Sequence, residues 1–549
     1  MDSKGRIAYI TTETAVDPYL HTYSGGLAVL SAAMGFAAHQ TNVPFVTVTL
    51  LPRHGYYDQT IEENPESHES SMGIRYVPRH YNDVLEDTGV VFPVAVADAR
   101  VFLKVWRLPG EVFKSGEVLF LDADIPENDW LSKQNTAYLY PSLERGGNEE
   151  RKIVQSILLG YGAVIALKQL GYAVDLYHLN EGYAGFTVLA LAAHYTASGL
   201  SLSDALTLAK KKCIFTTHTP EFAGNPAFPY DNVVRLLSDE RFNGVLWNAT
   251  SEHDRRINLT VFCLDHTACA NGVSVRHGKV ASAMWTRDIK SVTNGSDVHF
   301  WQHRDFASAN TPDELGRAKH VHKRGLLSFV AQETGHFLSE NVLTFVWARR
   351  WSAYKRPKLL FADMEWIVRL LRSNQIQVIF SGKPHPDDFG MRDAWNDVLR
   401  LSHQLPNLVI LPGYELELSK LLKRGTDVWL NNPRAPQEAS GTSGQSAAMN
   451  GALNLSTVDG WMCEANPENY FPFGVGPMSD HREQDARDAL ALRETLEARI
   501  LPLYSGDKNA WYTIALGAMR EAEQNWSATR MLGDYVAQMY GPTLRGPAS

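Results

Sequence analysis

The sequence predicts an α/β protein built on two parallel sheets, and two observations carry that prediction. Short apolar runs alternate with longer segments of helical periodicity along most of the 549 residues. This alternation is typical of strands and helices that follow one another in parallel sheets. The chain is also longer than one hydrophobic core usually supports. We therefore expect two domains, each with its own sheet.

The predicted elements follow in order along the chain. In the first half we expect strands at 7–11, 43–50, 174–178 and 213–217 and helices at 27–39, 153–170 and 205–212. Strand-like pieces between about 60 and 120 interrupt this order, and we predict an inserted β region there. In the second half we expect strands at 343–347, 377–380, 408–411 and 427–430 and helices at 358–372, 415–424 and 525–540.

The domain boundary is expected where the strand pattern lapses, between about 302 and 340. We place an N-terminal domain at 1–320, which contains the β insertion, and a C-terminal domain at 321–524. Residues 525–549 form a final helical segment. No internal repeat accompanies this division.

Composition excludes several classes of function. The formal net charge of −9 argues against a partner recognised through bulk positive charge, such as nucleic acid or an anionic membrane. The chain shows no leader-like segment and no apolar run long enough to span a membrane. Its four cysteines form no CxxC pair, which favours reduced thiols. We expect a cytoplasmic enzyme with no nucleic acid or membrane partner.

The segment 431–464 carries the most informative motif. Glu438-Ala-Ser-Gly-Thr442 forms a turn of small residues between a predicted strand and a predicted helix. The segment closely resembles the active-site signature of the α-glucan phosphorylases, which are GT-B glycosyltransferases. In that family a lysine after this turn forms a Schiff base with pyridoxal phosphate (PLP). Ser446 stands at that position, and because a hydroxyl cannot form an imine, we expect no PLP cofactor.

The resemblance extends from about residue 7 to about residue 540, with several motifs in the family's order. It implies a GT-B fold: two Rossmann-like domains with a cleft between them and a C-terminal helix that crosses back to the first domain. It also implies that the N-terminal domain takes the acceptor and the C-terminal domain takes the donor and its phosphate.

Four motifs resemble the family's sugar-binding segments. They are a Gly-rich turn at 23–27, HLNEGY at 178–183, FTTHTP at 215–220, and the stretch TNGSD at 293–297. The resemblance implies a catalytic-site role for His218, beside the donor sugar. It implies substrate binding by Gly25, Gly26, Leu27, Asn180, Glu181, Tyr183, Asn294 and Asp297. Tyr183 and Asp297 replace family histidines, which argues against a long glucan as acceptor.

The remaining motifs concern phosphate and donor. RRWSAYKR at 349–356 resembles the family's phosphate-binding segment, so Arg350 and Lys355 are expected to hold the leaving phosphate. Glu438 is expected to bind sugar hydroxyls. Nucleotide or phosphate binding is expected at Gly382, Lys383, Ser440, Gly441, Thr442 and Ser446. Lys383 could equally face solvent.

The leading hypothesis is a retaining, PLP-independent hexosyltransferase. It would use a nucleotide-diphosphate sugar and a small acceptor, of the kind found in secondary metabolism. No metal is expected, because the cationic side chains compensate the phosphate charge. Two alternatives stay open: an α-glucan phosphorylase with non-covalent PLP or none, and a catalytically silent sugar-binding protein. A homodimer is also compatible with the resemblance.

Overall fold

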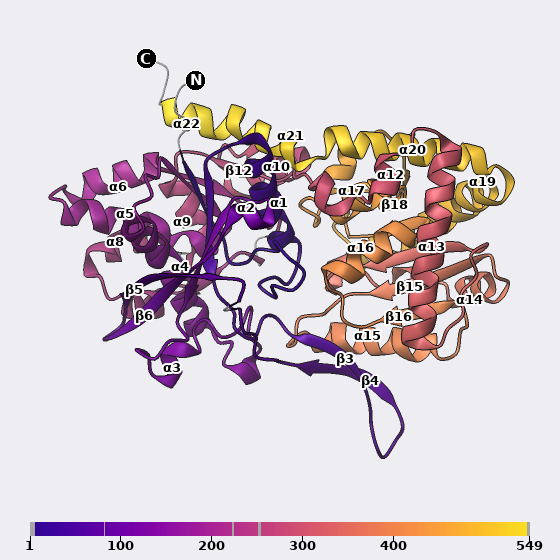
Figure 1. The fold of residues 1–549 in the computed structure, drawn as a ribbon, viewed down its shortest axis with the longest axis horizontal. Coiled ribbons are helices and arrows are strands. Elements are labelled where there is room, and N and C mark those ends of the chain that lie inside the picture. Colours follow the sequence, from indigo (N-terminus) through magenta and orange to yellow (C-terminus); the bar gives the residue numbers. More distant parts are fainter. Residues whose placement is uncertain (1–5, 82, 222–223, 251–253, 546–549) are drawn as a thin grey trace. The chain divides into compact units, whose positions relative to one another are not determined.

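The computed structural model describes residues 6–81, 83–221, 224–250 and 254–545 (Figure 1). Its contacts divide the chain into two compact units. The first unit contains Met1–Tyr56, Tyr76–Thr293 and Ala528–Ser549, and the second contains Tyr57–Arg75 and Asn294–Ser527. The chain thus passes to the second unit at residue 294, earlier than the sequence boundary at 320. Part of the predicted β insertion also belongs to the second unit.

A nine-stranded sheet forms the centre of the first unit, in the order β13-β12-β9-β8-β1-β2-β7-β6-β5. Its pairs are parallel from β13 to β7, and β5 and β6 add an antiparallel edge. The strands are β1 (Ile7–Ile10), β2 (Phe45–Leu50), β5 (Glu86–Val96), β6 (Ala99–Leu108), β7 (Glu117–Asp122), β8 (Leu176–Asn180), β9 (Cys213–Thr216), β12 (Ala270–Gly272) and β13 (Lys290–Ser291). Most of the predicted insertion therefore widens this sheet.

Helices cover the sheet of the first unit with two apolar clusters. One joins α4 (Glu149–Gln169) and α5 (Phe186–Ala197) to the strands. The other joins α1 (Gly26–Thr41) to the C-terminal segment. The strands β1 and β8 are buried along their whole length, as expected for parallel strands covered on both sides. The helices α6 (Leu202–Lys211), α9 (Leu259–His266) and α10 (Val275–Trp285) complete the unit.

The C-terminal segment returns to the first unit, which confirms the predicted crossing helix. It comprises α21 (Ala528–Tyr535), a π-helical turn at Val536–Tyr540 and α22 (Gly541–Arg545). Met531, Leu532 and Met539 lie in one buried cluster with Tyr9 of β1. The Tyr540 hydroxyl lies 2.9 Å from His178 Nδ1. The last four residues of the predicted segment, 546–549, lie outside the described residues.

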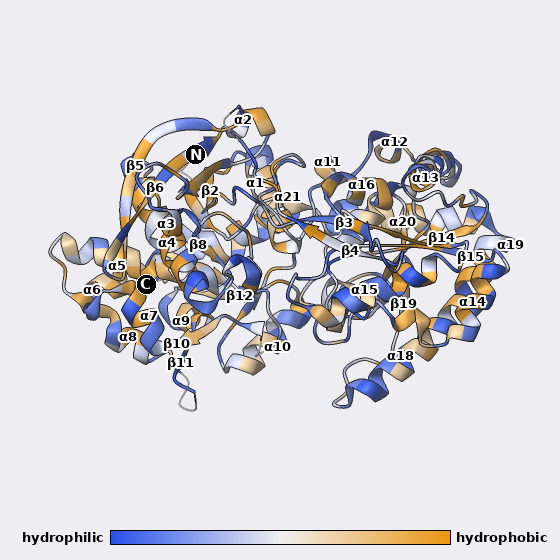
Figure 2. Ribbon diagram, turned by 90° about the horizontal axis from the view of Figure 1, so that it is seen from below, coloured by the Kyte–Doolittle hydropathy of each residue, from blue (hydrophilic) through white to orange (hydrophobic). Residues whose placement is uncertain are grey.

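The second unit has a parallel six-stranded sheet in the order β16-β15-β14-β17-β18-β19. Figure 2 shows apolar residues concentrated on strands such as β14, whereas the peripheral α18 (His481–Thr495) is largely hydrophilic. The strands are β14 (Leu343–Ala348), β15 (Ile376–Ser381), β16 (Leu408–Leu411), β17 (Val428–Asn431), β18 (Leu453–Thr457) and β19 (Phe471–Phe473). The flanking helices include α13 (Pro312–Thr334), α15 (Phe389–Ser402), α16 (Leu416–Gly425), α17 (Ser443–Ala448) and α20 (Lys508–Asn525).

The predicted helix at 358–372 is wrong in its first part. A 3-10 turn, Leu359–Phe361, comes first, and α14 (Met364–Arg372) begins only after it. The Asp363 carboxylate accepts a hydrogen bond from the Trp366 backbone N–H at 3.0 Å and caps the new helix. The apolar spacing continues through both pieces, so periodicity alone does not reveal this break.

A hairpin from early in the sequence belongs to the second unit. It consists of β3 (Asp58–Glu63) and β4 (Ser70–Arg75). The buried Gln59 side chain donates to the Gly382 carbonyl at 3.3 Å and accepts from the Gly413 N–H at 3.1 Å. It thereby joins the loops that follow β15 and β16.

These observations confirm the α/β fold class with two sheet-centred units and a returning C-terminal helix. Within the described part of the chain, every helix is too short or too polar to traverse a bilayer.

The substitution Leu532→Ala tests the packing of the returning helix. Leu532 is 1% exposed, so its truncation should cost about 2–5 kcal/mol of stability. Val536→Ala is the control, because Val536 is 40% exposed and should change stability by less than about 0.5 kcal/mol. Calorimetric melting of both variants measures the difference. Equal losses would show that the helix is not held by this buried face.

Candidate active site

The candidate donor-side residues of the second unit follow three neighbouring parallel strands. Arg349 comes directly after β14, Lys383 follows β15, and the turn containing Glu438 follows β17. Because parallel strands end at the same edge of a sheet, the fold brings these loops together. This edge is the place where open α/β sheets bind ligands.

A buried carboxylate and its cations form the centre of this edge. Lys355 Nζ lies 2.6 Å and Arg349 Nη1 3.7 Å from Glu438 Oε2. Burial raises the pKa of Glu438, yet the charges of Lys355, Arg349 and Arg350 and the Lys355 hydrogen bond bring that pKa below its ordinary value of 4.5. We call Arg349, Arg350 and Lys355 the cationic cluster. Lys355 and Arg349 lie against the carboxylate, and Arg350 acts on it electrostatically.

The structure places Arg349, which the motif match did not single out, against Glu438. The motif match singled out Arg350, but Arg350 is exposed, whereas Arg349 is only 6% exposed and contacts Glu438. Burial lowers the pKa of Arg349, and the Glu438 charge opposes that shift. The position of Arg349 was the available signal, because Arg349 directly follows a buried strand. The loops after parallel strands line the edge of the sheet where ligands bind.

Two buried polar atoms beside Glu438 lack partners. Arg349 Nε and Ser440 Oγ make no hydrogen bond to any part of the chain that the structure describes. Both residues are almost completely buried. Leaving such groups unpaired costs roughly 1–3 kcal/mol each, so the arrangement favours a polar ligand that supplies the missing acceptors.

Glycines shape this edge. Gly441 has a φ of +88°, and a Cβ there would lie 3.3 Å from Glu438 Cγ. Gly382 has a φ of +126°, and a Cβ there would lie 1.8 Å from the Arg349 carbonyl oxygen. Both positions therefore require glycine, because an L side chain would be strained and would push the cluster apart.

Ser446 lies inside α17 and is 2% exposed. Its Oγ donates to the carbonyls of Thr442 and Ser443, at 3.3 and 3.2 Å. The position thus offers no amine, and its hydroxyl is bonded to its own helix. A covalently attached PLP therefore does not fit this residue.

The segment carrying Asn294 and Asp297 packs against the same helix. Gln445 Nε2 donates to the Asn294 carbonyl at 3.0 Å, and Gln445 Oε1 accepts from Ser296 Oγ at 3.2 Å. Asp297 accepts from the Phe300 N–H at 2.7 Å and caps the short helix α11 (Val298–Trp301). The carboxylate of Asp297 therefore has a structural role in this unit.

Lys383 is buried and does not face solvent. Its Nζ donates to the Tyr57 carbonyl at 2.8 Å and to the Glu415 carboxylate. Glu415 follows β16 and was not identified from the sequence, because an isolated carboxylate before a helix carries no distinctive signal. The pair Lys383–Glu415 adds a second charged group at the carboxyl edge of the sheet.

In the first unit, the sheet edge brings Asn180, Glu181 and His218 together. His218 Nε2 donates to Asn180 Oδ1 at 2.7 Å, and the His218 N–H donates to Glu181 Oε1 at 2.6 Å. Glu181 has a φ of +75°, a strained value for this residue type, and among the described residues its buried Oε2 finds no partner. Burial raises the pKa of Glu181 and lowers that of His218 to about 3. His218 is therefore neutral at physiological pH.

The Gly-rich turn at 23–27 is held by a buried carboxylate of the same unit. The buried Glu13 carboxylate accepts from the Ser24 N–H at 2.6 Å and from Ser24 Oγ at 2.9 Å. A protein carboxylate thus already occupies backbone donors of this turn. A Cβ on Gly25 or Gly26 would meet nothing within 4 Å, and Leu27 is half-buried in the first turn of α1.

Tyr183 packs as an aromatic of the first unit. Its ring lies 6.3 Å from that of Phe228, centroid to centroid. It also lines a mainly apolar pocket of about 50 Å³ together with Thr12, Tyr140 and Lys152. The residue that replaces the family histidine therefore closes one side of a small apolar space.

Comparisons with known proteins identify the family of the chain. A family model described as carbohydrate phosphorylase matches residues 282–499. An uncharacterized protein of Methanocaldococcus jannaschii is 35% identical, over 97% of this chain and 99% of the relative. A glycogen phosphorylase of Mycobacterium tuberculosis is 30% identical, over 98% of this chain and 71% of the relative. A maltodextrin phosphorylase of Thermococcus litoralis is 29% identical over the same shares.

The fold and the family match support a glycosyltransferase-like transferase with the GT-B type of architecture. Within that class, the chain belongs to the carbohydrate phosphorylase family. The matched region contains the cationic cluster and Glu438 as well as the position of Ser446.

The variant Glu438→Gln tests the charge balance of the cluster. Because the pKa of Glu438 is lower in the folded state than its ordinary value, its ionised form stabilises the protein at neutral pH. That contribution is lost as pH falls through the depressed pKa. The difference in melting temperature between wild type and variant should therefore be fully present near pH 7 and shrink as the pH falls below about 4.5.

The exposed Glu417→Gln on α16 is the matched control and should leave the melting temperature nearly unchanged at every pH. A Glu438→Gln effect that does not vary with pH would show that the carboxylate charge is not the stabilising element.

The protonation of His218 is a second test. Burial lowers its pKa to about 3, so its imidazole carbon resonance should stay constant from about pH 8 to about pH 5. NMR titration of protein with ¹³C-labelled histidine measures this, and the His218→Gln variant assigns the signal. A midpoint near that of an exposed histidine would contradict the buried, neutral state.

Proposed function

We propose that the protein is a retaining glycosyltransferase that uses a nucleotide-diphosphate sugar and no PLP. The observation that carries the proposal is the combination of a cationic cluster around Glu438 with a buried serine at the Schiff-base position. The cations serve a phosphate-bearing donor, while the residue that would hold PLP is absent.

The cluster suits a diphosphate leaving group. Arg349 and Arg350 offer planar, multiple donors, and Lys355 offers a compact charge. Glu438 accepts a hydrogen bond from Lys355 at 2.6 Å. A donor diphosphate could supply an acceptor for Arg349 Nε, which finds none among the described residues. Glu438 could then accept hydrogen bonds from sugar hydroxyls.

The reaction is a single group transfer. The bond between the anomeric carbon and the diphosphate oxygen breaks, and the diphosphate leaves with the bonding electron pair. The acceptor oxygen forms its bond to the same face of the sugar, and its proton passes to the departing phosphate oxygen. Negative charge grows on the leaving group, where the fixed cations stabilise it most strongly. No metal is needed for charge compensation in this scheme.

The proposed acceptor is a small molecule. Tyr183 packs against Phe228, and Asp297 caps a helix, so neither replaces the family histidine as a polar sugar contact.

A second candidate is α-glucan phosphorolysis, favoured by the names of the relatives. The cationic cluster could hold inorganic phosphate as the attacking group. This reaction would need PLP bound without a Schiff base or a mechanism without PLP.

Ligand binding separates the candidates. Melting temperature and calorimetric titration should show stabilisation by one nucleoside diphosphate in a panel of bases. Arg350→Ala and Lys355→Ala should each weaken that binding by about 10- to 100-fold, because each removes a charged hydrogen bond worth roughly 1.5–3 kcal/mol. Lys358→Ala is the control, since Lys358 is exposed and pairs with Asp397.

Two results would overturn the proposal. One is a purified protein that contains pyridoxal phosphate and forms glucose 1-phosphate from maltodextrin and phosphate, which would establish the second candidate. The other is the absence of stabilisation by every nucleoside diphosphate, which would favour a protein that binds sugar without catalysis.

A further inference from the structure

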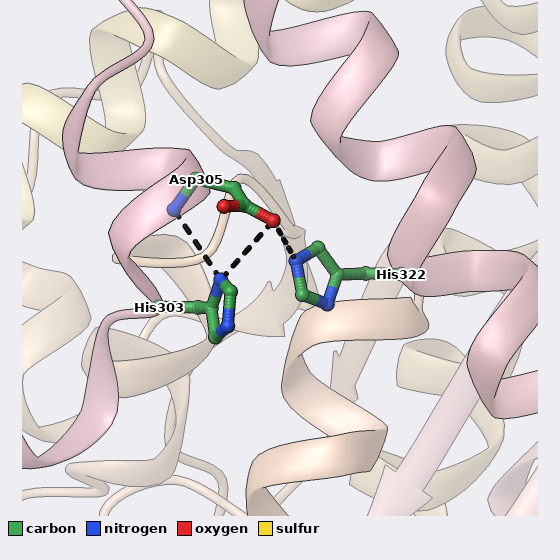
Figure 3. Close-up of side chains that lie close together, drawn as sticks. All are labelled: His303, Asp305 and His322. Carbon is green, nitrogen blue, oxygen red and sulfur yellow. Dashed lines mark hydrogen bonds and ion pairs between the residues drawn. The ribbon is translucent and has the colours of Figure 1, made fainter.

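Three potential metal-binding side chains meet in the second unit, away from the sequence motifs (Figure 3). His303 and Asp305 lie at the start of α12 (Arg304–Ala307), and His322 lies on α13. Asp305 Oδ2 is 3.3 Å from His303 Nδ1 and 2.9 Å from His322 Nε2. One ligand atom from each residue lies within 4.8 Å of the other two.

The hydrogen bonding at His303 keeps one ring nitrogen unprotonated. His303 Nδ1 accepts a hydrogen bond from the Asp305 backbone N–H at 3.3 Å. A nitrogen that accepts carries no proton, so it cannot also donate to Asp305 Oδ2 at 3.3 Å. Nδ1 has a single lone pair, which would turn from this long hydrogen bond to a cation placed between Nδ1 and Oδ2.

The donors are held in place before any ion arrives. The His303 backbone N–H donates to Asn450 Oδ1 at 3.0 Å. The His303 and His322 rings meet edge to face with centroids 4.4 Å apart, and His322 also contacts the Phe306 ring. Such support reduces the ordering that a ligand would have to impose.

We propose that His303, Asp305 and His322 form a binding site for a divalent transition metal of the zinc class. Two imidazoles and one carboxylate are ligand types that Zn²⁺ accepts. Metal–ligand bonds of about 2.0–2.2 Å in a tetrahedron separate the ligand atoms by roughly 3.3 Å. The two distances from Asp305 Oδ2 lie near that value. Asp305 is 41% exposed, so water can complete the coordination.

Neighbouring charges limit the affinity. Arg304 and Arg424 act electrostatically on both His303 and Asp305. Binding of a cation works against these guanidinium groups. We therefore expect a site that exchanges its metal and loses it to chelators. The Arg304→Ala variant should bind the metal more tightly.

The metal would connect α12 to α13 and steady the segment behind α17. Asn450, which accepts from His303, also donates to the Ser446 carbonyl at 2.9 Å and to the Trp301 carbonyl at 2.9 Å. The site is thus linked through one amide side chain to the end of the helix that carries Ser446. Its role is structural and does not depend on the proposed reaction.

Metal binding to the purified, tag-free full chain tests the proposal. After EDTA treatment and dialysis, titration with ZnCl₂ should show one site per chain and raise the melting temperature. The experiment is done in a Cys463→Ser background, because the exposed Cys463 is an alternative zinc ligand. Substitution with Co²⁺ should give the visible absorption of a four-coordinate ion.

His322→Ala and Asp305→Asn should each weaken zinc binding at least about tenfold and abolish the thermal shift. His320→Ala is the matched control, because His320 lies on the same helix but outside the cluster. The His322→Ala and Asp305→Asn variants show a melting transition if they are folded. This transition distinguishes loss of zinc binding from misfolding. Failure of zinc to bind the wild type, or equal binding by His322→Ala, would overturn the proposal.

Discussion

The buried ion pair between Lys355 and Glu438 is the interaction on which the donor-side edge depends. A carboxylate with almost no exposure stays ionised only because Lys355 and Arg349 lie next to it. Burial lowers the pKa of Arg349, and the charge of Glu438 opposes that shift. Glu438 thus compensates buried positive charge, and the two cations in turn keep the carboxylate ionised. The glycines at 382 and 441 allow the loops to approach closely enough for this balance.

The same reasoning explains why loss of the family lysine need not dismantle the site. Ser446 is satisfied by the carbonyls of its own helix, and Gln445 joins that helix to the segment at Asn294. Both of these contacts are neutral hydrogen bonds, so neither needs a charged group at position 446. The cationic cluster follows a different strand, and its geometry does not rely on the residue at 446.

Much of the fold could be predicted from the sequence, because alternating apolar runs report buried strands and helices directly. The predicted strand at 408–411 matches β16 residue for residue. The helix α13 was missed, although Thr311, Pro312 and Glu314 form a capping box at its start. The break before α14 was also hidden, since apolar spacing continues through it and only the cap at Asp363 reveals it. The edges of elements depend on single hydrogen bonds, which periodicity does not record.

The site was predictable where residues lie in one motif and not where they come from separate elements. Arg350, Lys355 and Glu438 stood in recognisable strings, whereas Glu415 and the His303–Asp305–His322 group are brought together only by the packed second unit. Asp297 stands in a motif and also caps a helix, a contact that the motif alone does not reveal. A motif identifies functional residues that lie close together in the sequence. Residues that come from separate elements are recognised as a group only in the folded chain.

The hairpin with Gln59 has a further consequence for how this chain can be taken apart. The second unit is encoded in two stretches separated by more than two hundred residues, and Gln59 supplies partners for Gly382 and Gly413. A gene fragment that begins at residue 294 would leave those two backbone groups bare. During synthesis on the ribosome, the hairpin is made long before Gly382 and Gly413. The Gln59 side chain therefore cannot form these two hydrogen bonds until the later residues have been synthesised. Dissection of the enzyme into halves therefore calls for a circular permutant or a grafted hairpin, not a simple cut.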